Sequence, residues 1–223
     1  MTRNMKIVIC QLLILLSLNC FGTKEDYWRD KSDWSPLMKA TFKSNYNKMV
    51  RLIKKGKHDF DKQKIKLDAV EIAIRNQDPV ALYILLNTGK VSFSNSGNLI
   101  MIASGYKNLE IIKMLINFGF PVVDGVNQYS PLMAACLYSS VEIVEYLINN
   151  GSDINQYNKS NGMTPLMYAV LNGNIPIVKL LLERGANKDA VDNGGQKALD
   201  YITVAREGVI NDSVKMELEK LLK

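Results

Sequence analysis

The side chains that could support catalysis are few in this 223-residue chain. His58 is the only histidine, so a histidine-based general acid or base has one position to occupy. A catalytic triad would also need Ser and Asp side chains that converge on His58, which falls in a polar segment between two apolar stretches. Cys136 follows two alanines in an apolar stretch, a setting typical of a buried cysteine rather than a nucleophile. Neither residue predicts an active site.

Patterns that bind metal ions or phosphate are also absent from the sequence. No cluster of Cys and His has the spacing of zinc ligands. Asp153, Asp189 and Asp192 lie in turn-rich segments, where we expect their carboxylates to form Asx turns. Residues 193–195 follow no strand pattern and precede no Lys-Ser/Thr pair, so they predict a turn rather than a phosphate loop. We therefore predict a protein that is not an enzyme and has no metal and no cofactor.

The chain is organised around a segment of 22 residues that occurs five times, at 35–56, 68–89, 98–119, 130–151 and 164–185. The third residue of every copy is apolar, and a glycine follows it 19 positions later. The apolar positions are Leu37, Val70, Ile100, Leu132 and Leu166, and Leu199 starts a sixth, degenerate copy. Consecutive positions are 33, 30, 32, 34 and 33 residues apart. A repeat of this length indicates stacked supersecondary units.

Each copy reads as two short helices. Ser130 and Thr164 are good N-cap residues, and the prolines that follow them suit the first helical position. The second helix carries apolar residues at helical spacing, and the closing glycine suits a left-handed residue just beyond its end. Two such helices cannot bury their own apolar faces, so each unit must be covered by the next.

The starts of two copies resemble the T-P-L-H-x-A motif of ankyrin repeats: TPLMYA at 164–169 and SPLMAA at 130–135. The resemblance covers residues 35 to about 223. It implies an all-α fold, an ankyrin-repeat α-solenoid of about six helix-turn-helix units with projecting β-hairpin loops. Methionine replaces the family's histidine in four copies, which removes a hydrogen-bonding side chain, so we expect less rigid turns there. The expected units of this ankyrin repeat domain, 34–223, are 34–66, 67–96, 97–128, 129–162, 163–195 and a C-terminal cap at 196–223.

Residues 1–22 form a leader with a basic start and an apolar run over 7–18. Twelve helical residues span roughly 18 Å, too short to cross a bilayer, so the leader predicts a cleaved secretion signal. Two processing routes are open. Cys20 is lipidated as in bacterial lipoproteins, or cleavage falls before Thr23; residues 23–33 are then a tether. We expect an exported protein, either a periplasmic or cell-envelope lipoprotein or a secreted one.

The formal net charge is +6, and much of the excess lies between Lys39 and Lys66. One interpretation is a solvated end cap on a lysine-rich protein. The other is a surface that faces anionic headgroups or an acidic partner. Nucleic acid is not expected as a partner of an exported chain without a groove pattern of basic and aromatic residues.

By resemblance to ankyrin arrays, partners dock on the concave face, which the hairpin tips and the exposed ends of the first helices form. The candidate positions on that face are Trp34, Phe42, Lys43, Arg75, Tyr106, Tyr129, Leu137, Tyr138, Tyr157, Met163 and Leu171. We expect these positions to be solvated, and the aromatic residues among them to form an exposed row. Aromatic and Arg side chains are enriched at binding hot spots because they bury large, rigid surfaces.

The sequence thus predicts a monomeric protein-interaction scaffold that binds a protein partner, with membrane contact only through the lipid anchor. Two alternatives stay open: a secreted effector that acts on a host protein, and an accessory protein that supports a periplasmic enzyme.

Overall fold

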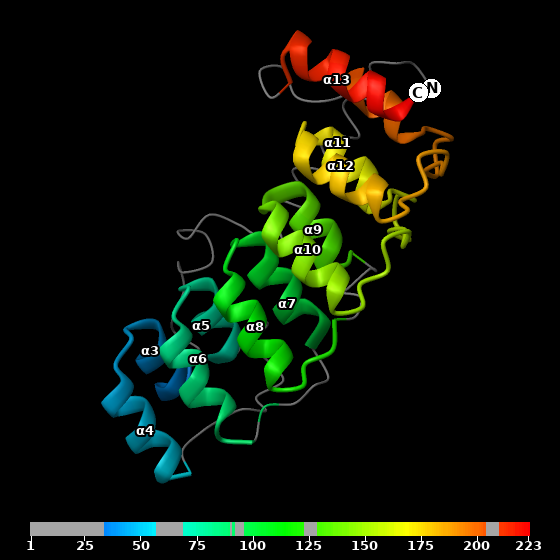
Figure 1. Ribbon diagram of the computed structural model, residues 1–223. Coiled ribbons are helices and arrows are strands. Elements are labelled where there is room, and N and C mark those ends of the chain that lie inside the picture. Colours follow the sequence, from blue (N-terminus) through cyan, green and yellow to red (C-terminus); the bar gives the residue numbers. More distant parts are fainter. Residues whose placement is uncertain (1–33, 57–68, 90, 92–95, 123–128, 204–209) are drawn as a thin grey trace.

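The computed structural model describes residues 34–56, 69–89, 91, 96–122, 129–203 and 210–223. The predicted secretion signal, the predicted lipidation site Cys20, the predicted tether and His58 lie outside the described residues. The described chain forms one elongated stack of helix pairs, which runs from the first unit at one end to the C-terminal cap at the other (Figure 1).

The helices alternate between a first and a second member of each unit. In chain order they are α3 (Pro36–Phe42), α4 (Tyr46–Lys54), α5 (Ala69–Arg75), α6 (Pro79–Leu86), α7 (Ser96–Gly105), α8 (Leu109–Asn117), α9 (Pro131–Tyr138), α10 (Val141–Asn149), α11 (Pro165–Leu171), α12 (Ile175–Glu183), the 3₁₀ helix η3 (Ala198–Thr203) and α13 (Asp212–Leu222). The odd-numbered helices from α3 to α11 pack in one row that continues into η3. The even-numbered helices form a second row, in front in Figure 1.

The predicted capping residues begin the helices. The hydroxyl groups of Ser35 and Ser130 accept hydrogen bonds from the backbone N–H groups of Met38 and Met133, at 3.1 and 3.2 Å. Asn and Asp side chains cap most of the second helices, and the Asp78 carboxylate, for example, accepts from the Ala81 N–H at 2.9 Å. These bonds satisfy backbone donors that a helix start otherwise leaves without a partner.

The methionines that replace the family's histidine keep a weak contact at two of the turns. The Ser130 N–H points to the sulfur of Met133 at 3.5 Å, and the Thr164 N–H points to the sulfur of Met167 at 3.4 Å. A thioether is a weak acceptor, but it still occupies the place of a capping-box side chain. At these two turns the substitution therefore weakens the hydrogen bond rather than removing it.

A continuous core fills the space between the two rows. Five alanines lie three residues after the apolar slots and are at most 2% exposed, and their small side chains let adjacent first helices approach closely: Ala40, Ala73, Ala103, Ala135 and Ala169. At the C-terminal end, Leu218 and Leu222 of α13 are buried against the stack and Leu221 is half-buried. The last helix thus covers the core at this end of the stack.

The all-helical solenoid is confirmed, with one correction to its loops. Residues 152–163 and 186–196 turn back by single hydrogen bonds, such as Asn158 N–H to Met163 C=O at 3.0 Å, and no described residue is in a strand. These two loops are therefore hairpin-shaped turns, which side chains rather than a strand ladder hold together. Among the described helices, none is both long enough and apolar enough to cross a bilayer.

Candidate functional site

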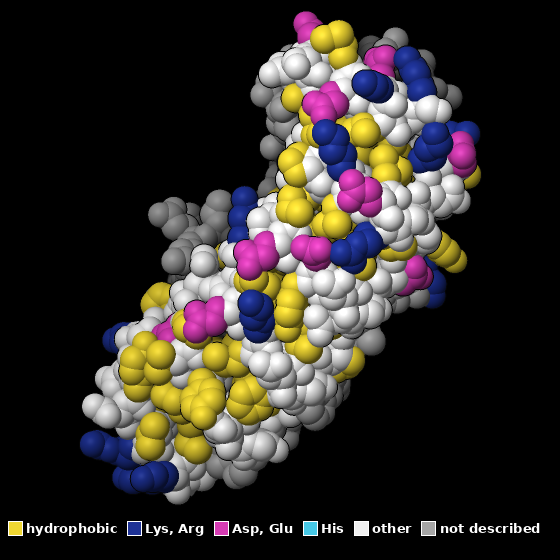
Figure 2. Space-filling model, in the orientation of Figure 1, with side chains coloured by type: hydrophobic (Ala, Val, Ile, Leu, Met, Phe, Trp, Pro, Cys, Tyr) yellow, Lys and Arg dark blue, Asp and Glu magenta, His cyan; other side chains and the backbone are white. Residues whose placement is uncertain are grey.

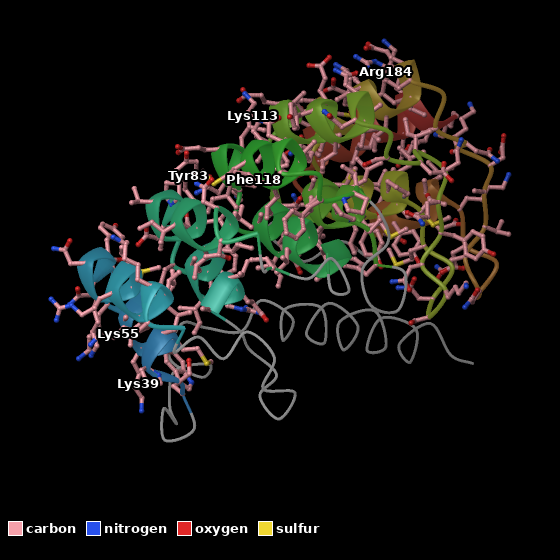
Figure 3. All side chains as sticks on the ribbon, turned by 90° about the horizontal axis from the view of Figure 1, so that it is seen from below. Lys39, Lys55, Tyr83, Lys113, Phe118 and Arg184 are labelled. Atoms are coloured by element: carbon pink, nitrogen blue, oxygen red, sulfur yellow. The ribbon has the colours of Figure 1, made fainter. Side chains whose placement is uncertain are left out.

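The stack presents two long faces. The second helices form one face, which we call the outer face. We call the opposite side, which the first helices and the inter-unit loops form, the first-helix face. Figure 3 shows Tyr83, Lys113, Phe118 and Arg184 along the edge of the outer face, whereas Lys39 of α3 lies at the opposite edge. The eleven predicted binding residues all belong to the first helices or the loops next to them.

Their exposure divides them into three groups. Lys43 and Tyr157 are exposed, and Tyr157 keeps 58% of its surface. Phe42, Tyr106 and Tyr138 are half-buried. The remaining six are buried: Trp34, Arg75, Tyr129, Leu137, Met163 and Leu171. The expectation that the candidate positions are solvated is therefore wrong for these six, of which Trp34 and Tyr129 are aromatic. Their role in binding stays a prediction.

Ring contacts account for two of the buried aromatics. Trp34 packs edge-to-face on Phe42, with ring centroids 5.4 Å apart, and Tyr129 packs in the same way on Tyr168 at 5.3 Å. Tyr168 belongs to the following unit, so the second contact joins two neighbouring units. Leu137, Met163 and Leu171 belong to the continuous core. These side chains contribute to packing between units, which a pattern read within one copy does not reveal.

Arg75 is buried rather than solvated, because an acidic side chain pairs with it. Its guanidinium is paired with Glu71, one turn earlier on α5, with N–O distances of 2.6 and 2.9 Å. Arg75 is 3% exposed, so this is a buried, charge-assisted contact. The pair explains how a charged residue occupies the first-helix face without being solvated there.

The loops before and after α11 and α12 are held to each other. The Asn155 side chain bridges to the next loop, because its amide donates to the Gly185 carbonyl at 3.2 Å and its oxygen accepts from the Asn187 N–H at 2.8 Å. The Asn193 N–H donates to the Asn161 carbonyl at 3.0 Å. Residues 152–163 and 186–196 therefore form one connected surface, which we call the loop platform.

Side chains from the helices anchor the loop platform. The Tyr168 hydroxyl accepts hydrogen bonds from the amides of Asn158 and Asn161, at 3.0 and 3.1 Å. The Tyr201 hydroxyl donates to Asp192 at 2.6 Å. Tyr157 lies in this tethered loop, so the platform presents an exposed aromatic ring on an ordered backbone.

The aspartates of these loops have structural roles. Asp153 and Asp192 form the predicted Asx turns, since they accept from the N–H groups of Asn155 and Gly194 at 2.9 and 2.8 Å. Asp189 instead pairs with Lys197 at 2.8 Å. That hydrogen bond lowers the pKa of the Asp189 carboxyl and raises the pKa of Lys197. In the described part of the chain, no three His, Cys, Asp or Glu residues group as metal ligands would.

An apolar group on the outer face, whose members are exposed or half-buried, was not predicted from the sequence. It comprises Tyr46, Val50, Val80, Tyr83, Leu109, Met114 and Phe118, and we call it the outer patch. Figure 2 shows these apolar side chains gathered over α4, α6 and α8. The signal that could have revealed it is the segment 79–86, PVALYILL, a second helix without a charged residue.

Comparison with known proteins agrees with this architecture. A family model described as ankyrin repeats in three copies matches residues 70–158, 99–192 and 152–211. Among solved structures, the crystal structure of the ankyrin repeat domain of Bcl-3 superposes with a TM-score of 0.65 at 20% identity, and the match covers 85% of this chain and 99% of that one. Its title calls that protein a unique member of the IκB protein family. Comparison with curated proteins finds no match.

At this identity the Bcl-3 likeness supports the fold alone, whereas the family model covers more than half of the chain. This chain therefore belongs to the ankyrin-repeat family.

Proposed function

We propose that this protein is a binding scaffold without catalytic activity of its own, and that it contacts a protein partner through the first-helix face and the loop platform. The ankyrin-repeat fold generally mediates protein–protein interaction. The observation that carries the proposal for this chain is Tyr157, a large aromatic side chain that is 58% exposed on a loop tied to its neighbours by hydrogen bonds. A preorganised aromatic residue contributes binding energy at a low cost in entropy.

The revised contact surface is smaller than the row of eleven residues suggests. Tyr157 and Lys43 are accessible to a partner, and Phe42, Tyr106 and Tyr138 are accessible in part. The six buried residues support the shape of the face rather than offering their side chains to a partner. Val191, which is 55% exposed, adds an apolar side chain on the other loop of the platform.

An affinity capture from the native organism tests this proposal. The baits are the full chain, a Tyr157→Ala variant and a Lys179→Ala variant, which removes an exposed side chain on the outer face. We expect a partner that the full chain and Lys179→Ala capture equally and that Tyr157→Ala captures about tenfold less. Equal capture by all three baits would contradict a role for the loop platform.

We further propose that the protein acts in an extracytoplasmic compartment. The basic start, the short apolar run and Cys20 of the leader support this placement. Mass spectrometry of the chain isolated from its own cells distinguishes the two processing routes. An acylated N-terminal Cys20 indicates a lipoprotein, and an N-terminal Thr23 indicates a secreted product. A chain that keeps Met1 in the cytoplasm would overturn the proposal.

A further inference from the structure

The outer face changes character along the stack. The residue 13 positions after each apolar slot lies on the solvent side of a second helix: Val50, Tyr83, Lys113, Glu145 and Lys179. The last two pair with neighbouring elements, Glu145 with Arg184 at 2.8 Å and Lys179 with Glu217 at 2.7 Å. Lys113 lies 5.6 Å from the centre of the Tyr146 ring. The same position is therefore charged and engaged in three units but apolar in the first two.

Helix α6 is the centre of this apolar region. It contains no charged residue, yet Val80 is 49% exposed and Tyr83 is 54% exposed. A helix that is apolar on all sides is normally buried on all sides. The stack covers only one side of α6, so Val80 and Tyr83 form a surface that another molecule can cover.

A groove lies beside Tyr83. It runs between α6 and α8, and its lining consists of Tyr83, Leu109, Glu110, Lys113, Met114, Asn117 and Phe118. Within this lining, the rings of Tyr83 and Phe118 meet edge-to-face, with centroids 6.1 Å apart (Figure 3). Such a hollow with aromatic and thioether walls fits one inserted apolar side chain.

The surroundings of the outer patch are basic. Residues 34–56 contain five lysines and one arginine and no acidic residue. Arg51 and Lys54 lie one and four positions after Val50 on α4 and are exposed beside it, and Lys113 lines the groove at the other end. Glu110 is the single acidic residue in the lining of the groove. The charge of the first unit therefore favours an acidic occupant.

We propose that the outer patch binds an acidic segment of another protein, with one bulky apolar side chain in the groove beside Tyr83 and Phe118. Its Asp or Glu side chains then contact Arg51, Lys54 and Lys113. A segment with an inserted anchor fits a hollow better than a flat bilayer surface does. A second copy of this chain fits less well, because a two-fold contact centred on α6 would place the basic first unit of one copy against Lys113 of the other.

This site is separate from the surface in the proposed function. The loop platform and the outer patch lie on opposite faces of the stack, so both can be occupied at the same time. The patch is small, and small interfaces belong to weak or transient complexes. The protein would then connect a partner on its first-helix face to a second, acidic partner on its outer face.

The test begins with random short peptides displayed on phage and selected on the immobilised full chain. We expect selected peptides to combine an aromatic or large aliphatic residue with at least two acidic residues. Synthetic versions of these peptides should bind Tyr83→Glu, and the double variant Arg51→Glu and Lys54→Glu, at least about tenfold more weakly than the native chain. The affinity should also fall as the salt concentration rises.

Lys179→Glu is the matched control, because it introduces an acidic residue at the same repeat position of the fifth unit, outside the patch. It should leave peptide affinity within about twofold, and Tyr157→Ala should do the same, which separates this site from the loop platform. Thermal melting followed by circular dichroism should show that Tyr83→Glu keeps the native fold, since the Tyr83 side chain is more than half exposed.

Three results would overturn the proposal. The first is a set of selected peptides without acidic residues, or with affinity that Tyr83→Glu does not change. The second is Tyr83-dependent sedimentation with vesicles that contain anionic phosphatidylglycerol, which would make the occupant a membrane. The third is a dimer in light scattering that Tyr83→Glu dissociates, which would make the occupant a second copy.

Discussion

Burial determines what Cys136 can do. Its side chain is 0% exposed within α9, and burial raises the pKa of its thiol far above the ordinary value of 9.0. A thiol is nucleophilic only as a thiolate, so this cysteine is inert in the folded protein. The sequence-based interpretation of Cys136 as a small buried hydrophobic residue agrees with its position.

The first prediction concerns the reactivity of Cys136. We expect no reaction with an aromatic disulfide reagent in the native protein and full reaction after unfolding in guanidinium, as read by absorbance. The pKa is raised in the folded state, so the unfolded thiol ionises first. The free energy of unfolding should therefore fall as pH rises above about 9. A Cys136→Ala variant should lack the part of this fall in unfolding free energy that the thiol causes. Rapid modification of the thiol in the native protein would contradict its burial.

Gly162 is a residue for which contact and conformation both require glycine. Its φ is +77°, and a Cβ atom there would lie 2.5 Å from the backbone nitrogen of Asn193 in the next loop. Gly151 has a φ of +93°, but a Cβ at that position would meet nothing within 4 Å. Substitutions at these two glycines therefore distinguish the free-energy cost of backbone strain from the cost of a clash between loops.

We predict that Gly162→Ala destabilises the protein more than Gly151→Ala. Gly151→Ala carries only the cost of the left-handed conformation, about 1 kcal/mol. Gly162→Ala adds the displacement of the adjacent loop, so its cost should reach about 2–3 kcal/mol. Urea denaturation of the two variants measures the difference, and equal costs would show that the loops are not in firm contact.

At the scale of elements, the turn between the two helices of a unit contains a left-handed residue in four of the five full units, whereas Ser139 and Ser140 of the fourth unit are extended. Ser44, Gln77, Lys107 and Gly173 occupy this turn with φ values of 47°, 55°, 59° and 65°. Only the fifth unit uses glycine there, although every unit uses glycine after its second helix. The other three side chains hold a conformation that L-residues rarely adopt.

We predict that Lys107→Gly stabilises the protein by about 0.5–1 kcal/mol, because relief of the left-handed strain exceeds the added entropy of the unfolded chain. The reverse change, Gly173→Ala, should destabilise it by a similar amount. Denaturant midpoints of both variants provide the measurement. A destabilised Lys107→Gly would mean that the lysine side chain makes a stabilising contact there.

The helices were predictable because their signals are local. Ser35, Ser130 and Thr164 cap the helices that the prolines after them begin. The burial of Tyr129 was not predictable in the same way. Tyr129 meets a ring 39 residues away in the next unit. A pattern within one copy contains no information about such a contact.

The candidate site was predictable only in part, for the same reason. Tyr157 is exposed as expected, since a polar loop has no core beside it. Arg75 is buried because Glu71 compensates its charge, and that pairing depends on how α5 faces its neighbours. Val80 and Tyr83 were not predicted because they lie on α6, a second helix, whereas the family's partners are expected on the first helices.

At the scale of the whole molecule, each unit contacts its neighbours and little else, as in other solenoids. The two faces of the stack are therefore independent surfaces on one rigid core. Ion pairs between units, such as Glu145 with Arg184, occur on the outer face towards the C-terminal end, whereas the N-terminal end keeps an apolar and basic surface. This asymmetry gives the stack a direction that a partner can recognise.

The last helix should be essential to the stack. Leu218 is 0% exposed and covers the end of the core. We predict that Leu218→Ala lowers the free energy of unfolding by about 2–5 kcal/mol, because it leaves a cavity at the cap. The exposed Met216 of the same helix is the control, since Met216→Ala should change stability by less than about 0.5 kcal/mol. Similar losses for both variants would contradict a cap that packs through Leu218.

The central claim is that this protein binds a protein partner through the first-helix face and the loop platform. Site-specific photo-crosslinking in the native cells tests it most directly, with a photoreactive phenylalanine analogue in place of Tyr157 or, as the control, of Lys179 on the outer face. We expect a crosslinked product that forms at position 157 and not at position 179, and mass spectrometry identifies the captured protein. No crosslink at position 157, or the same products at both positions, would contradict it.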